Sequence, residues 1–148
     1  MIEKEIRKMA DYKGSSIAEH PATTSGKQYR RVLSASTLAG DKVVNAKGED
    51  LGKINEIMID IPLGRVAYAV LSFGGFLGMG DKLFAIPWAR LAVDEENKRF
   101  VLNVDKATLE KAPGFDKSNW PDMSDQSWGS RIYSYYGVNP YWESNIRR

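Results

Sequence analysis

The stretch Gly48-Glu-Asp-Leu-Gly-Lys-Ile-Asn-Glu-Ile-Met-Ile-Asp60 decides the fold of this chain. It begins as a turn and continues as a strand, because apolar and polar residues alternate from Ile57 onward. The spacing from Leu51 to Ile54 breaks this alternation by one residue, and Gly52 lies at the break. A glycine inside a strand pattern marks a bulge or a close approach of two backbones. The stretch therefore predicts a strongly bent strand in a small β-sheet.

Further short strands are expected on both sides of this stretch, separated by turns rich in Gly, Pro and Asn. The expected strands are Val43–Asn45, Arg65–Phe73, Lys82–Ile86, Trp88–Val93 and Lys98–Val104, together with the strand that ends at Asp60. Both faces of the Arg65–Phe73 segment are largely apolar, which predicts the central strand. Six short strands joined mostly by tight turns predict a mainly β fold, a small six-stranded antiparallel sheet that closes or nearly closes into a barrel.

The chain is expected to have three parts. Residues 1–31 are rich in small and charged residues and predict a flexible N-terminal arm that carries a basic cluster of Lys27, Arg30 and Arg31. Residues 32–105 carry the barrel pattern, and residues 106–148 form a C-terminal extension with short helices. The second of these helices is expected to begin after Ser124, and Trp128, Ile132 and Tyr135 would share one face, with Tyr136 beside them.

Composition narrows the possible functions. The chain has 148 residues, no cysteine and a formal net charge of +2. Thiolate catalysis, disulfides and cysteine metal sites are therefore excluded, and the small charge disfavours nucleic acid as a partner. No run of about 18 apolar residues predicts a transmembrane helix, and the charged N-terminus lacks a signal-peptide segment. We expect a cytoplasmic protein, with peripheral membrane association left open.

Three segments together resemble a known family. They are the spacing of Leu38, Gly40, Val43, Asn45, Gly48 and Gly52 up to Asp60, the run Gly64–Gly80, and Lys82 to Pro87-Trp88. This pattern resembles the PRC-barrel domain, named after the cytoplasmic part of the photosynthetic reaction-centre H subunit, and also the C-terminal domain of the ribosome maturation factor. The resemblance implies a six-stranded barrel used for protein contacts, with no catalytic residues. The transmembrane helix of the H subunit and the N-terminal domain of the ribosome factor are not matched here, so the resemblance points to a free-standing bacterial member. Its role is unknown, and a link to stress is expected from the resemblance.

The Gly74–Gly80 loop could be taken for a phosphate site, but the glycines of such a site lead into a helix. Here Lys82 begins an expected strand, so the loop is interpreted as a connection between strands. Phe76, Leu77 and Met79 are large apolar residues on this loop and are candidates for contact with a partner. As an alternative, the loop would act as the lid of a small-ligand or metal-responsive sensor.

No catalytic, metal or cofactor site is expected. His20 is the only histidine, which is too few for a catalytic triad or a zinc site. The carboxylates Glu49, Asp50, Glu56 and Asp60 are interpreted as a solvated strand face, and Asp94-Glu95-Glu96 lacks the spacing of a calcium loop. We therefore expect a protein without enzymatic activity.

Aromatic residues crowd into the last quarter of the chain and are candidates for an interaction surface. The candidate residues are Trp120, Trp128, Tyr135, Tyr136, Tyr141 and Trp142. These rings are expected either to pack on the barrel or to meet another copy of the chain. The leading hypothesis is a non-enzymatic protein-interaction module that forms a homodimer and binds an unidentified protein. The alternatives are the sensor above and an RNA-processing or ribosome-associated factor that would use the basic arm.

Overall fold

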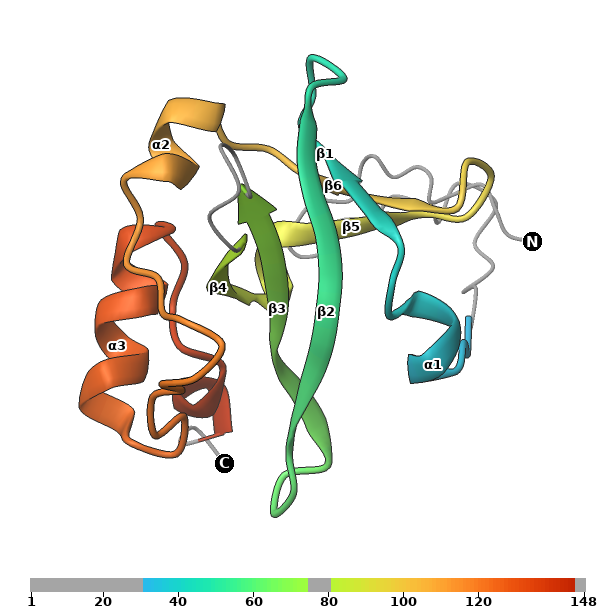
Figure 1. Ribbon diagram of the computed structural model, residues 1–148. Helices are drawn as coiled ribbons and strands as arrows, with labels where there is room; N and C mark the ends of the chain where they lie inside the picture. The colour runs from blue at the N-terminus through green and yellow to red at the C-terminus, as the bar shows by residue number, and fades with distance from the viewer. Residues whose placement is uncertain (1–30, 75–80, 146–148) are drawn as a thin grey trace.

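The computed structural model describes residues 31–74 and 81–145, and these contain one six-stranded sheet of order β4-β3-β2-β1-β6-β5 (Figure 1). The strands are β1 (Lys42–Val44), β2 (Asp50–Asp60), β3 (Arg65–Gly74), β4 (Asp81–Pro87), β5 (Leu91–Asp94) and β6 (Arg99–Leu102). The helices are α1 (Ala35–Leu38), α2 (Lys106–Glu110) and α3 (Gln126–Tyr135), with the 3-10 helices η2 (Trp88–Arg90) and η3 (Tyr141–Asn145). The predicted mainly β fold with six strands is confirmed.

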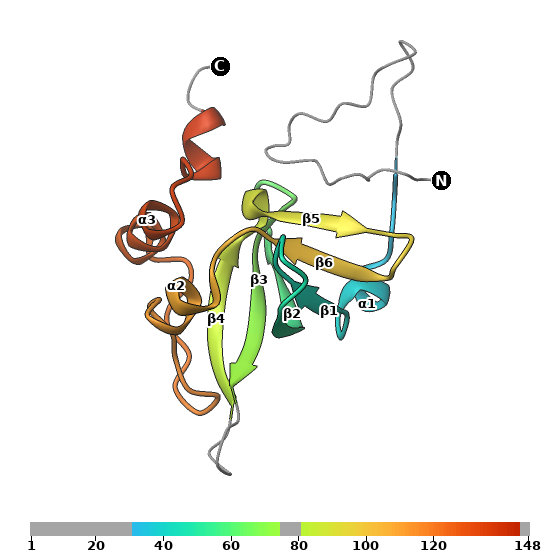
Figure 2. The same cartoon turned by 90° about the horizontal axis from the view of Figure 1, so that it is seen from above.

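The sheet differs from the prediction in two respects. It is mixed, because β1 and β6 pair in parallel while its other neighbouring strands are antiparallel. It is also an open half-barrel, since β4 and β5 stand at its two ends. In Figure 2, β5 and β6 cross the direction of β3 and β4, so the sheet curls around the core. The antiparallel prediction was wrong at β1 and β6 because no tight turn joins these strands.

The predicted bend at Gly52 is confirmed. Gly52 has a φ of +107°, and the pairing register between β1 and β2 shifts beside it. A Cβ atom on Gly52 would lie 2.0 Å from the carbonyl oxygen of Ser72 on β3. The bend therefore requires glycine at position 52 for two reasons, the positive φ and the close approach of the β3 backbone.

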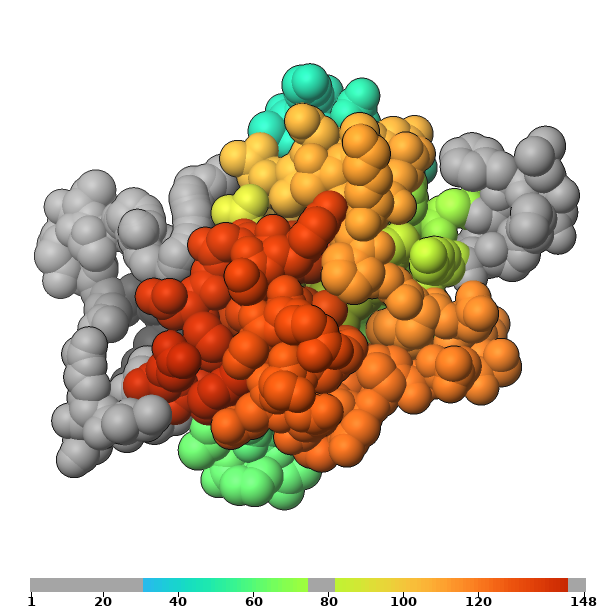
Figure 3. Space-filling model, turned by 90° about the vertical axis from the view of Figure 1, so that its left-hand side faces the viewer, coloured from blue at the N-terminus to red at the C-terminus, as the bar shows by residue number. Residues whose placement is uncertain are grey.

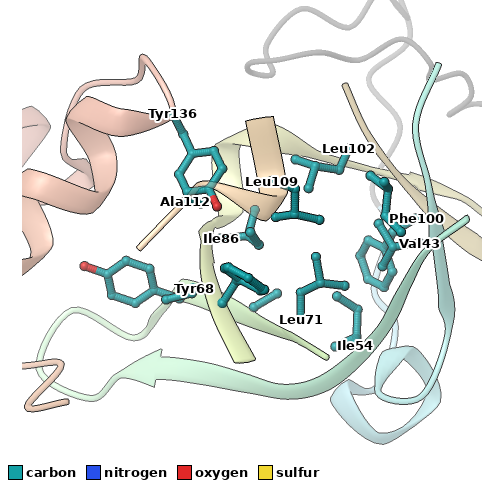
Figure 4. Close-up of a cluster of buried hydrophobic side chains, with 14 of the residues drawn as sticks. Val43, Ile54, Tyr68, Leu71, Ile86, Phe100, Leu102, Leu109, Ala112 and Tyr136 are labelled. Atoms are coloured by element: carbon teal, nitrogen blue, oxygen red, sulfur yellow. The ribbon is translucent and has the colours of Figure 1, made fainter. Parts of the chain in front are cut away.

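Strand β3 is buried from Ala67 to Phe73, as expected from its two apolar faces. It lies next to the end of the sheet order and is not the central strand. Leu71 belongs to the cluster enclosed by the curled sheet, together with Ile54 and Ile86, as Figure 4 shows. Tyr68 contacts Trp128 and Tyr133 of the C-terminal extension. The extension is thus a second layer on the sheet, and this explains why both faces of β3 are buried.

Helix α3 buries Ile132 and Tyr136 of the predicted face and half-buries Trp128, but it does not bury Tyr135. Its buried residues are Gly129, Ile132 and Tyr133, and Tyr136 follows on the same face one turn later. Tyr135 instead is 39% exposed. The helix is capped by Asp125, whose carboxylate accepts a hydrogen bond from the Ser127 backbone at 2.9 Å, and not by Ser124.

Several sequence predictions lie outside the described residues. These are the arm before Arg31 with His20, Lys27 and Arg30, and the loop residues Phe76, Leu77 and Met79. The loop connects two strands, β3 and β4, as expected. Within the described residues, none of the helices has the length and apolar character needed to cross a membrane.

Candidate interaction surface

The C-terminal extension uses most of its aromatic rings to hold itself on the sheet. The hydroxyl of Tyr133 donates a buried hydrogen bond of 2.7 Å to the carbonyl oxygen of Ala67 on β3. The ring of Tyr68 lies edge-on to the rings of Trp128 and Tyr133, with centroids 5.4 and 5.5 Å apart. Such edge-to-face pairs are worth about 0.5–1.5 kcal/mol each beyond the burial of their area. The rings therefore form an internal interface between the extension and the sheet.

Gly129 on α3 shows how closely the two layers fit. A Cβ atom at this position would lie 2.6 Å from the Tyr68 hydroxyl and 2.8 Å from the Trp142 ring. Trp142 in turn stacks edge-on against Tyr133, with ring centroids 5.6 Å apart. Figure 3 shows the extension, in orange and red, covering one side of the molecule.

The predicted interaction residues therefore divide into two groups. Trp128, Tyr136, Tyr141 and Trp142 are buried or half-buried and touch rings of their own chain. Trp120 and Tyr135 are 37% and 39% exposed, although Trp120 also lies against Phe115. The expectation that the tail packs on the barrel is confirmed for the first group.

Burial also changes the titration of the tyrosines. Burial raises the pKa of Tyr68 to about 12. Burial likewise raises the pKa of Tyr133, Tyr136 and Tyr141, and nearby tyrosines or Asp60 add to the effect. The hydroxyls of Tyr68 and Tyr136 are buried without a hydrogen-bond partner among the described residues. These raised pKa values follow from packing and need no catalytic role.

Three exposed aliphatic side chains lie on the β2–β3 hairpin tip, which we define as residues 59–64. Ile59 is 46% exposed, Ile61 is 79% exposed and Leu63 is 43% exposed, all within five consecutive residues. The hairpin extends beyond the rest of the sheet at the bottom of Figure 1, and its green tip projects below the extension in Figure 3. Contiguous exposed apolar side chains on a projecting element are typical of a contact site.

Two charged residues, Asp60 within the hairpin tip and Arg65 directly after it, both contact Tyr141. Asp60 accepts a hydrogen bond from the Tyr141 hydroxyl, and Arg65 lies over the Tyr141 ring at 5.1 Å from its centroid. The hydrogen bond from Tyr141, with a second from the Leu63 backbone, lowers the pKa of Asp60. The tip thus presents aliphatic side chains beside two charges that already have partners.

Sequence reasoning missed the hairpin tip as a site. The segment between the strand that ends at Asp60 and the strand that begins at Arg65 was expected only to be one of the turns between strands. The available signal was the pair Ile61 and Leu63, two large apolar residues inside that turn, where polar residues are usual.

Most of the carboxylates that the sequence singled out make local contacts within the chain. Asn45 donates a side-chain hydrogen bond of 2.7 Å to Glu49, and the Gly52 backbone donates one of 2.8 Å to Asp50. Arg31 forms an ion pair of 2.8 Å with Glu95, and Asp94 forms one with Arg99. Within the described residues, no group of three or more His, Cys, Asp or Glu side chains could hold a metal ion.

Comparison with known proteins identifies the family. A PRC-barrel domain model matches residues 30–109, which is more than half of the chain. The chain therefore belongs to the PRC-barrel family, as the resemblance in its strand spacing predicted.

The solved structures add a similarity to a 16S ribosomal RNA processing protein, RimM, from Pseudomonas aeruginosa. The match has 17% sequence identity and a TM-score of 0.35, and it covers 60% of this chain and 50% of that chain. This chain therefore spans about half the length of that protein, and a likeness at this TM-score carries no argument about function. No curated protein sequence matches the chain.

Proposed function

We propose that this chain is a non-enzymatic protein-interaction module that binds another protein through the hairpin tip. The observation that carries the proposal is the exposure of Ile59, Ile61 and Leu63 on one projecting hairpin. A protein partner with an apolar cleft fits this surface, because its exposed side chains are aliphatic and the neighbouring Asp60 and Arg65 are held against Tyr141. A link to stress is proposed with it on the family resemblance alone, and a cytoplasmic location on the lack of a signal-peptide pattern in the N-terminal sequence.

The small size of the tip limits the binding free energy that it can contribute by itself. Burying the exposed parts of three aliphatic side chains contributes about 2–5 kcal/mol, taking full burial of each as roughly 1.5–3 kcal/mol. A micromolar complex needs about 8 kcal/mol, and a stable interface buries roughly 800 Å² on each partner. The tip is therefore proposed as the anchor of a larger contact area.

Substitution of Ile61 tests this proposal. The full-length chain would be immobilised as Ile61→Asp, as Val32→Asp and as the unchanged sequence, and exposed to a lysate of its source cell. Val32 is the matched control, since it is an aliphatic residue that is 91% exposed outside the tip. We expect Ile61→Asp to weaken capture of a partner more than about tenfold, as for an interface anchor, and Val32→Asp to leave it unchanged. Equal capture by the three proteins, each with an unchanged circular dichroism spectrum, would refute the proposal.

A homodimer is a second proposal and uses a different surface. It is supported by the exposure of Trp120 and Tyr135, because aromatic side chains are common anchors at the centre of interfaces. Light scattering of the full chain should then report a dimer, and the Trp120→Ala, Tyr135→Ala double variant a monomer. A monomer in both cases would refute the homodimer proposal.

The other two candidate functions have less support. Arg31, the member of the predicted basic cluster that lies within the described residues, pairs with Glu95, which leaves less positive charge for RNA. The sensor alternative depends on the Gly74–Gly80 loop, most of which lies outside those residues.

A further inference from the structure

We infer that Tyr141 is a positioning residue that clamps both stems of the hairpin tip, so that the C-terminal extension shapes the docking surface from behind. This inference rests on the proposed function of the tip. It assigns the extension a task other than direct contact with the partner.

The first half of the clamp acts on Asp60, the last residue of β2. The Tyr141 hydroxyl donates to one carboxylate oxygen of Asp60, and the Leu63 backbone donates to the other at 3.0 Å. The backbone amide of Gly64 donates to the carbonyl oxygen of Asp60 at 2.8 Å. Asp60 is therefore the residue that organises the turn, and Tyr141 fixes the orientation of its side chain.

The second half acts on Arg65, the first residue of β3. Asp60 and Arg65 face each other as the last paired residues before the turn. The guanidinium carbon of Arg65 lies 5.1 Å from the centroid of the Tyr141 ring, within the range of a cation–π interaction. A single side chain thus contacts both members of the pair that closes the hairpin.

Tyr141 is itself held by the extension. Its ring lies 6.0 Å from that of Tyr133 and 5.1 Å from that of Trp142, measured between centroids. Tyr133 is fixed to β3 through the carbonyl oxygen of Ala67. These contacts connect the well-packed part of the sheet to the base of the tip through the extension.

The contacts of Tyr141 compensate for the low intrinsic stability of the projecting hairpin. A two-stranded ribbon that projects beyond its sheet is at best marginally stable by itself. A docking surface that is ordered before binding avoids the entropy cost of ordering during binding. Tyr141 provides that order at the base of the tip, at the last paired residues Asp60 and Arg65.

Hydrogen–deuterium exchange of the full chain tests the clamp without any partner. The amides to follow are those of Leu63 and Gly64 in the tip and that of Leu71 in the core. Tyr141→Phe removes the hydrogen bond to Asp60 and keeps the ring, while Tyr141→Leu removes both contacts. The matched control is Tyr135→Phe, which removes a hydrogen bond of 2.6 Å to Thr108 elsewhere in the extension.

We expect Tyr141→Phe to accelerate exchange at Leu63 and Gly64 about two- to tenfold, the factor that corresponds to the loss of one net hydrogen bond. Tyr141→Leu should accelerate it further, and Leu71 should be unaffected in both variants. The inference is overturned if tip exchange stays at the wild-type rate, if Tyr135→Phe accelerates it equally, or if the Leu71 amide accelerates by the same factor. Because no partner takes part, this result is independent of whether Ile61→Asp abolishes docking.

Discussion

Adding a single methyl group at Gly52 should destabilise the fold far more than the same change at Gly48. Both glycines belong to the turn and strand that open the sheet, and both have positive φ, +107° at Gly52 and +83° at Gly48. Their surroundings differ, because a Cβ at Gly48 would meet nothing within 4 Å, while one at Gly52 would lie 2.0 Å from the Ser72 carbonyl oxygen. The pair therefore separates backbone strain from the close approach of β3.

The magnitudes follow from these two costs. A left-handed conformation costs an alanine roughly 1–2 kcal/mol, and this is the whole effect expected for Gly48→Ala. At Gly52 the overlap with β3 adds about 1–3 kcal/mol or more, since the neighbouring atom is backbone and cannot rotate away. Gly52→Ala should thus cost about 2–5 kcal/mol, a large part of the 5–15 kcal/mol stability of a typical domain.

Urea unfolding followed by circular dichroism measures both free energies. The m-value should stay the same for Gly48→Ala, which shows that the comparison is between similar folded states. Equal losses at the two positions, or a Gly52→Ala protein as stable as wild type, would refute the explanation of the bend. A stable, normally folded Gly52→Val protein would refute it still more strongly.

Two further predictions concern the tyrosines. Tyr133→Phe should lower the free energy of unfolding by about 1 kcal/mol, because it removes the hydrogen bond to Ala67. Tyr68→Phe should be neutral or slightly stabilising, since the Tyr68 hydroxyl is buried with no partner among the described residues. Equal losses of the two variants in urea unfolding would contradict this prediction. Raised folded-state pKa values favour the neutral tyrosine, so the stability from Tyr68, Tyr133, Tyr136 and Tyr141 should be complete below pH 10 and be lost as the pH rises through those values. Absorbance at alkaline pH should then show these four tyrosines ionising in step with unfolding, and their ionisation near pH 10 in a folded chain would contradict the burial.

Local features of the sheet could be predicted from the sequence, and its long-range pairing could not. The bend at Gly52 was predicted because a break in the alternation of apolar and polar residues can be recognised from neighbouring residues alone. The parallel pairing of β1 with β6 was missed, because four strands separate the two along the chain and no turn constrains their direction.

The candidate site was predicted only in part. Aromatic residues in the tail were predicted to make contacts, but the face of α3 was assigned incorrectly at one residue: Tyr135 was placed with Trp128 and Ile132, whereas Tyr133 takes the buried position. A 100° step per residue makes such an error easy when neighbouring positions are all aromatic. The clamp of Tyr141 on Asp60 joins residues 81 positions apart, and no local pattern reveals such a contact.

The most direct test of docking through the hairpin tip is site-specific photo-crosslinking in the source cell. A photoreactive amino acid would replace Ile61 in one protein and Val32 in another, both of which are exposed aliphatic positions. If the hairpin tip docks a partner, a discrete crosslinked protein complex should form from position 61 and none from position 32. Crosslinking from position 32 alone, or from neither position, would contradict it.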